Sequence, residues 1–409
     1  MEIRALVSAM WRSRTGPILV AAQVAITLAV VVNMAYLIQQ RLETAAKPTG
    51  IDIDNVFWVR LEAIDPDYNY EAALRADLEY LNDLPGVIAA TSSNGTPQTF
   101  YSLGLPFAPS ADQLDKGGGQ GARVFMADEH YLDALGLELI AGRNFESSVF
   151  VPPAQDVPSG IAAWAPEVII TRYMADKLFP DGNAVGKPLY VGLVNRSSTV
   201  VGVVKLLQGA PMPIEQFALM NVLVPIIPPG PNPFYIVRTE PGRRDATMAR
   251  VEQELADRVP GRFMSQIEAL EKTAAQARFS FRSSATILSV IGVFVLAVTL
   301  VGITGLAAFN VTTRTRQLGT RRAIGARKFH ILRYFIVENW IITSVGALVG
   351  CALALAAGIK LSTTYALPRL PLYFLVAGVV AIWILGLLAV VVPARRAASI
   401  SPATATRMV

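Results

Sequence analysis

The side chains that could do chemistry are few in this sequence. His130 and His330 lie 200 positions apart, without the spacing of a histidine metal site, and the single cysteine, Cys351, lies inside an apolar run. We therefore expect no metal site and no disulfide, and a cysteine that packs as a small apolar side chain. Asp128 and Glu129 stand beside His130 and would suit acid–base chemistry. Three adjacent polar residues before a helix are more typical of a solvated helix cap, which is our prediction.

One segment resembles a phosphate-binding loop: Gly182-Asn-Ala-Val-Gly186-Lys187-Pro188. Nucleotide-binding loops place four residues between the glycines and a Ser or Thr after the lysine, whose hydroxyl binds magnesium. Here only three residues separate the glycines, and Pro188 follows the lysine. We predict a turn that enters a strand, and a chain that does not itself hydrolyse ATP. The nucleophile settings of serine hydrolases and the calcium loop of EF-hands are also missing.

The composition indicates that much of the chain lies in a membrane. Of the 409 residues, 53% are hydrophobic and 16% are charged, and the mean hydropathy is +0.43. Soluble domains carry about 25% charged residues, so the low value argues against a soluble enzyme and for a chain that lies largely in lipid. The net charge of +5 could indicate nucleic acid, but its distribution along the chain explains it better.

Four segments are long and apolar enough to cross a bilayer. The first, at 17–38, contains 22 residues without a charge, enough to cross about 30 Å of hydrocarbon. No cleavage site follows it, which favours an uncleaved anchor. Residues 1–16 are predicted to form an amphipathic helix on the cytoplasmic membrane surface. The other three spans are predicted at 281–309, 335–359 and 372–392.

Basic residues in the short flanks orient these spans. The segments 1–16, 310–334 and 393–409 together hold thirteen Lys and Arg and a single acid, Glu2. Because short cytoplasmic segments are enriched in Lys and Arg, we predict both termini and the 310–334 loop in the cytoplasm. The large segment 39–280 is then outside, and a short outer loop lies at 360–371. The positive charge is a topology signal, so we expect no nucleic-acid partner.

The outer segment is predicted to be a mixed α and β domain with two lobes. Strands are expected at 56–62, 167–170, 188–194, 199–204 and 234–238, and helices at 70–82, 171–179 and 245–258. Loops are expected at 116–121, 151–160 and 225–233. Long irregular stretches at 93–121 and 145–165 are the candidate contacts for a substrate or partner. A helix from Ser265 to Arg314 would form a stalk of 50 residues, with a break at 279–284 as the alternative.

Small and polar residues in the spans indicate helix packing. Gly346 and Gly350 form a small-xxx-small motif, which lets two helices approach closely in lipid. Glu338 lies at the membrane edge. The uncharged polar residues Gln23, Asn33, Thr299 and Thr304 are predicted to form hydrogen bonds between helices. No span carries an internal charge that would suggest an ion or proton path.

The segment 309–340 is the most informative, because apolar residues are set among its arginines. Charge alone would make it a loop on the membrane surface, whereas the arrangement also suits a short amphipathic helix that docks into another protein. Its sequence RTRQLGTRRAIGARKFHILRYFIVEN at 314–339 resembles the signature of MacB and FtsX-like ABC permeases. The residues that match the family pattern are Arg314, Gly319, Arg322, Ala323, Gly325, Ala326, Ile331 and Glu338.

The resemblance extends over the rest of the chain. The segments 135–145, 168–192, 199–204 and 234–242 are similar to the family's periplasmic core domain, and 393–407 is similar to its C-terminal tail. Gln317 departs from the pattern, since the family usually has Glu there. This removes a negative charge from the docking segment and bears on how tightly it couples, or on whether the chain is one of two unequal permeases.

The resemblance implies an inner-membrane permease with a periplasmic domain and no ATPase of its own. It implies a partner ABC ATPase that holds ATP and Mg, a second permease in a homodimer or heterodimer, and a periplasmic adaptor with an outer-membrane channel. Cofactors in this chain itself are then not expected. The implied ATPase-coupling residues are Arg314, Gln317, Gly319, Arg322, Ala323, Ile324, Gly325, Ala326 and Arg327.

The resulting hypothesis is a MacB-type efflux permease that transmits ATP-driven motion to its outer domain and exports a peptide, antibiotic or toxin. Three alternatives stay open. The first is an FtsX-like regulator of a periplasmic wall hydrolase, although an outer domain near 240 residues favours export. The second is a lipoprotein-releasing permease. The third is a membrane-anchored enzyme, which turnover by residues 41–279 would support.

Overall fold

The computed structural model divides the chain into two compact units. The core domain comprises residues 43–281, and the membrane unit comprises residues 1–42 and 282–409. The residues that the structure describes are 15–65, 68–99, 102–147, 164–192, 196–210, 212, 215–228, 230, 232–315, 320, 324, 327–365 and 368–399.

The first sheet of the core domain has four antiparallel strands in the order β11-β1-β10-β2. Their bounds are Val56–Ala63 for β1, Val87–Ser93 for β2, Phe234–Thr239 for β10 and Arg262–Ala269 for β11. Helices α3 (Tyr70–Asp83) and α8 (Arg244–Glu254) pack on one face through a shared cluster that includes Leu81, Phe57 and Val251. Along β1, Phe57, Val59 and Leu61 belong to this cluster and Val56 and Trp58 belong to another, so the sheet carries a core on both faces.

A buried ion pair lies beneath α3. Arg262 on β11 donates hydrogen bonds to both carboxylate oxygens of Asp77 on α3, and their side chains are 1% and 0% exposed. The Tyr235 hydroxyl donates to the same carboxylate at 2.6 Å, and Arg262 also donates to the carbonyl of Leu255. Two charges can remain this deep because they are paired and hydrogen-bonded to each other.

The second sheet has seven strands in the order β5-β8-β6-β9-β4-β3-β7. Their bounds are Leu103–Ala108 for β3, Gln120–Met126 for β4, Leu139–Gly142 for β5, Glu167–Thr171 for β6, Pro188–Val191 for β7, Arg196–Val204 for β8 and Asn221–Val224 for β9. Strand β8 also pairs with β7, so six of these strands close into a ring that encloses apolar residues such as Phe107, Val124 and Ile170.

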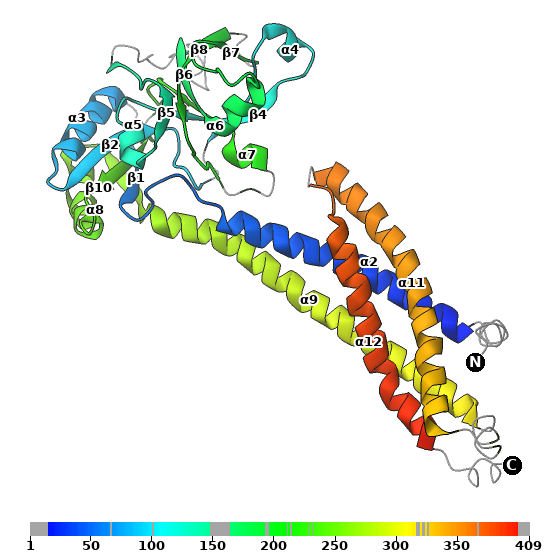
Figure 1. Cartoon of the computed structure of the whole chain (residues 1–409). Helices are drawn as coiled ribbons and strands as arrows, with labels where there is room; N and C mark the ends of the chain where they lie inside the picture. The colour runs from blue at the N-terminus through cyan, green and yellow to red at the C-terminus, as the bar shows by residue number, and fades with distance from the viewer. Residues whose placement is uncertain are drawn as a thin grey trace. The chain divides into compact units, whose positions relative to one another are not determined.

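Short helices connect these strands: α4 (Ala111–Asp115), α5 (Tyr131–Leu135), α6 (Arg172–Leu178) and α7 (Glu215–Leu219). The two sheets share one apolar cluster, in which Trp58 and Ile236 of the first meet Phe125 and Ile169 of the second. The predicted mixed α and β domain is confirmed, and its two sheets correspond to the expected lobes (Figure 1).

Among the described residues, four helices are long and apolar enough to cross a membrane, as predicted. They are α2 (Thr15–Ala46), α9 (Leu270–Thr313), α11 (Lys328–Tyr365) and α12 (Leu372–Ser399). Figure 1 shows α11 and α12 side by side. Helix α12 continues through Pro393 to Ser399. The predicted surface helix at 1–16 lies almost wholly outside the described residues.

Three local predictions are wrong. The stalk helix begins at Leu270, because residues 262–269 form strand β11 on β1, where Met264 and Ile267 pack against the buried cluster of the first sheet. From there α9 runs for 44 residues without the alternative break at 279–284. The stretch 93–121 is not irregular, since it contains β3 and α4. Strand β8 begins at Arg196, three residues before the predicted start, because it pairs there with β7.

Candidate functional site

A buried ion pair joins the end of α9 to α11. Arg314 follows the last residue of α9, and its Nη1 atom lies 2.9 Å from Oε1 and 3.2 Å from Oε2 of Glu338 on α11. The two side chains are 18% and 8% exposed. Because water screens a pair in such surroundings weakly, the interaction is stronger than that of an exposed ion pair. It therefore links the residue that follows α9 to α11, on either side of the basic segment between them.

The spacing of α11 explains why Glu338 points inward. Ile331, Phe335, Glu338 and Ile342 follow one another at intervals of three or four residues, so they share one helix face. The three apolar members of this stripe are buried in the same cluster, together with Val311 of α9. A carboxylate on a buried stripe requires a partner, and Arg314 supplies it.

The predicted coupling residues are described only in part. Arg314 belongs to the ion pair, Ile324 is 82% exposed, and Arg327 is exposed next to the start of α11. The predicted residues Gln317, Gly319, Arg322, Ala323, Gly325 and Ala326 lie outside the described residues. An apolar side chain as exposed as Ile324, in a basic segment, can contact another protein. Sequence reasoning assigned Arg314 to coupling and Glu338 to packing, whereas the structure brings the two together.

Gly346 and Gly350 lie against α2 of the same chain. A Cβ atom on Gly346 would lie 2.7 Å from the Ala21 carbonyl oxygen, and one on Gly350 would lie 2.9 Å from that of Ala25. Glycine at both positions lets the two backbones approach closely. This small-xxx-small face therefore packs against a helix of the same chain and is not free to contact a second copy.

The predicted hydrogen bonds between spans are confirmed. The Thr27 and Thr299 hydroxyls are 2.7 Å apart, and the Asn33 amide donates to the Ala354 carbonyl at 3.1 Å. The Thr304 hydroxyl donates to the Ala389 carbonyl at 3.2 Å, and the Gln23 amide donates to the Val298 carbonyl at 3.4 Å. These polar groups connect helices, which is their usual role in membrane proteins.

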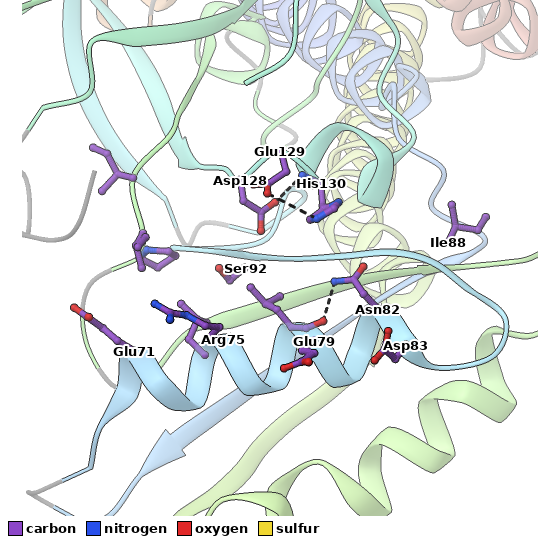
Figure 2. A pocket seen from close by; sticks show the side chains of 15 residues that line it. Glu71, Arg75, Glu79, Asn82, Asp83, Ile88, Ser92, Asp128, Glu129 and His130 are labelled. Atoms are coloured by element: carbon purple, nitrogen blue, oxygen red, sulfur yellow. Dashed lines mark hydrogen bonds and ion pairs between the residues drawn. The ribbon is translucent and has the colours of Figure 1, made fainter. Parts of the chain in front are cut away.

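A pocket of about 570 Å³ lies in the core domain, beside α3. Figure 2 shows Glu71, Arg75 and Glu79 on α3 and the loop with Asp128 to His130 across from them. Apolar residues, including Leu74, Leu78, Ile88 and Ile226, complete the lining. Acids outnumber bases around this apolar interior, so the pocket suits an amphipathic group that carries a positive charge.

Burial raises the pKa of Asp128, an acid that lines this pocket. Desolvation raises the pKa of Asp128 to about 6, although its carboxylate accepts hydrogen bonds from the Thr91 hydroxyl at 2.5 Å and from the His130 backbone N–H at 3.0 Å. The second bond closes a turn before α5, whose N-cap residue, His130, has no side-chain cap bond. The predicted solvated cap is therefore wrong, because Asp128 accepts from Thr91 of β2 in the pocket wall and does not cap the helix.

Sequence reasoning missed this pocket, because its residues come from four separate segments. The one available signal was the α3 stripe of Glu71, Arg75, Leu78, Glu79 and Asn82, whose spacing places charged and apolar side chains on one face. Asn82 itself holds the helix to β2, since its amide oxygen accepts from the Ala90 N–H at 2.8 Å.

The segment that resembles a phosphate loop is a turn that enters β7, as predicted. Gly182 and Gly186 have φ angles of 81° and 83°, which favour glycine, and Lys187 pairs with Asp181. This pairing occupies the lysine that a phosphate loop would direct at its nucleotide. Within the described part of the chain, no group of three His, Cys, Asp or Glu side chains could hold a metal ion.

These features define a class: a membrane protein with four candidate spans and a mixed α and β domain inserted between the first and the second. Residues 18–257 match the family model of the MacB-like periplasmic core domain, and residues 289–402 match that of the FtsX-like permease C-terminal region. The first match covers more than half of the chain. The chain therefore belongs to the MacB/FtsX-like family of ABC transporter permeases, and the resemblance seen in the sequence is confirmed.

Two relatives illustrate the similarity. The macrolide export ATP-binding/permease protein MacB of Neisseria gonorrhoeae is 26% identical over 270 residues, which are 64% of this chain and 39% of that protein. An uncharacterized ABC transporter permease of Bacillus subtilis, YknZ, is 24% identical over 302 residues, which are 70% of each chain. The chain thus spans well under half of the MacB protein that it matches.

Two solved structures are also similar. The extracellular domain of YknZ from Gram-positive bacteria covers 51% of this chain at 17% identity and a TM-score of 0.32. The periplasmic region of MacB from Actinobacillus actinomycetemcomitans covers 56% at 14% identity and a TM-score of 0.33. The family assignment rests on the sequence matches.

Proposed function

We propose that this chain is the permease subunit of an ABC export system, driven by ATP hydrolysis on a separate ATPase subunit. The observation that carries the proposal is the buried pair of Arg314 and Glu338. It links the residue after α9 to α11, on either side of a basic segment with an exposed Ile324, so we expect a force applied to that segment by a partner to pass to both helices.

Two further observations support transmission of motion by the helices. Helix α9 continues unbroken for 44 residues, from the first sheet of the core domain to Arg314. The polar side chains Thr27, Asn33 and Thr304, within the described part of the spans, are hydrogen-bonded between helices. These bonds leave them unsuited to a polar path for substrate, so we propose that a substrate is moved by the core domain, outside the membrane.

The ATPase, a second permease, an adaptor and an outer-membrane channel are the proposed partners, and the inner membrane with both termini in the cytoplasm is the proposed location. The first experiment is affinity purification of the tagged chain from its host in mild detergent, followed by mass spectrometry. An ABC ATPase together with a periplasmic adaptor is the expected result. An ATPase with a wall hydrolase, or with lipoproteins and no adaptor, would favour the regulatory or the lipoprotein-releasing alternative. No ATPase at all would contradict the proposal.

The second experiment tests the docking segment. Arg322→Glu combined with Ile324→Asp should abolish the ATPase activity that the permease stimulates in the purified complex, because it reverses a charge and removes an exposed apolar contact. Lys360→Glu, an exposed charge reversal at the other end of α11, is the matched control and should leave that activity unchanged. Full stimulation in the double variant would contradict docking at this segment.

A further inference from the structure

A groove between helices α11 and α12 lies on the outside of the helix bundle. Its volume is about 300 Å³, and it is lined by Ile336, Asn339, Trp340, Thr343, Trp383, Ile384, Leu387 and Val390. The rings of Trp340 and Trp383 lie 5.7 Å apart at an angle of 44°, and they are 52% and 36% exposed. Two large aromatic side chains therefore form a wall that faces away from the helix bundle.

The polar side chains of this groove are already bonded. The Asn339 amide donates to the Gly386 carbonyl at 3.1 Å, and the Thr343 hydroxyl donates to the Asn339 carbonyl at 2.9 Å. Gly386 allows this close contact, since a Cβ atom there would lie 2.9 Å from Cγ2 of Thr343. What remains for a ligand is an apolar and aromatic surface, which suits a hydrocarbon chain.

A cationic residue lies at the same end of the groove on each helix. Arg333 precedes Trp340 by seven residues, or two turns, so the two lie on one face of α11 about 10 Å apart along the axis. Arg395 follows Ile384 by eleven residues, or three turns, so these two share a face of α12 about 16 Å apart. Both arginines are exposed. Half of a bilayer's hydrocarbon core is about 15 Å thick, so the groove and its arginines fit within one leaflet.

We propose that this groove binds an anionic phospholipid, with an acyl chain against Trp340 and Trp383 and the headgroup phosphate between Arg333 and Arg395. The charge of the two arginines selects this occupant. Basic positions at the end of a groove between membrane helices attract anionic headgroups, and each Lys or Arg there strengthens binding about fivefold. A zwitterionic lipid would fill the groove without that gain.

The test is native mass spectrometry of the purified full chain, titrated with phosphatidylglycerol or phosphatidylcholine of the same acyl chains. Phosphatidylglycerol should bind more than tenfold more tightly. Arg333→Gln and Arg395→Gln should each weaken phosphatidylglycerol about fivefold and weaken phosphatidylcholine much less, because its choline cation offsets the charge of the phosphate. Arg369→Gln is the matched control, since Arg369 is an exposed arginine in the connection at the opposite ends of α11 and α12, and it should change neither lipid.

Two results would overturn the proposal. One is equal affinity for both lipids, or an equal loss with Arg369→Gln, because that would show a diffuse effect of net charge. The other concerns a second copy of the chain as the occupant. If Ile384→Cys in a Cys351→Ala background forms disulfide-linked dimers in native membranes, the groove is a protein contact. The arginine variants alter exposed positions, and an unchanged helical circular dichroism spectrum will verify that they fold.

Brominated phosphatidylglycerol locates the bound lipid. Bromine quenches tryptophan fluorescence at short range, so a chain in the groove should quench the emission of Trp340 and Trp383. The double variant Trp340→Phe with Trp383→Phe should lose most of this quenching, while it keeps the apolar wall and the bound lipid. Unchanged quenching in that variant would place the lipid elsewhere and refute the assignment.

Discussion

Removal of one partner of the Arg314–Glu338 pair should destabilise the membrane unit strongly. Glu338→Gln keeps the shape of the side chain and leaves the Arg314 guanidinium, 18% exposed, without its counter-charge. The loss of one partner of a buried pair costs about 3–5 kcal/mol, against about 0–1 kcal/mol for an exposed pair. Arg314→Gln should cost a similar amount, because it leaves the Glu338 carboxylate, 8% exposed, unpaired.

The assay is thermal unfolding of the purified chain in detergent at pH 7 for wild type, both single variants and the double variant. At about 2–4 °C per kcal/mol, each single variant should lower Tm by roughly 10 °C. The Tm of the double variant should fall by far less than the sum of the two single-variant decreases, because the second substitution removes a charge that has already lost its partner. Arg250→Gln, whose pair with Glu254 is 51% and 43% exposed, is the control and should change Tm by no more than about 2 °C. Additive single effects, or shifts as small as the control, would refute the reasoning.

Three more predictions follow from the described contacts. Gly346→Ala should lower the free energy of unfolding by about 1–3 kcal/mol, because its Cβ would lie 2.7 Å from a backbone oxygen of α2. Gly305→Ala is the control: a Cβ there has no atom within 4 Å, so the variant should be neutral in the same unfolding assay. The raised pKa of Asp128, about 6, means that the folded state holds this proton more tightly than the unfolded state. The contribution of Asp128 to stability is therefore complete below about pH 4 and is lost as pH rises through about 6. Asp128→Asn should remove this contribution to the pH dependence and add about 1–3 kcal/mol at pH 7, as tryptophan fluorescence melts of variant and wild type between pH 4 and 8 will test. Arg262→Met should lower the free energy of unfolding by about 3–5 kcal/mol, because it leaves the fully buried Asp77 carboxylate without its counter-charge. A melting temperature equal to that of wild type would contradict a stabilising role for this ion pair.

The four candidate spans, the mixed α and β domain and the family could all be predicted from the amino-acid sequence. Runs of apolar residues are a property of the chain read along its length, so they need no knowledge of contacts. The same holds for α3 and α6, whose periodicity gave bounds within a residue or two of the observed Tyr70–Asp83 and Arg172–Leu178.

Contacts between residues that are distant in the sequence could not be predicted in this way. Residues 262–269 carry no strong strand signal, and they become β11 because β1 offers a free edge and an apolar cluster that Met264 and Ile267 can complete. Arg314 was predicted to couple to a partner and Glu338 to pack between helices, whereas in the structure their side chains lie 2.9 Å apart. Pairing across 24 positions depends on how whole elements pack, and the free energy of that packing cannot be read from either segment alone.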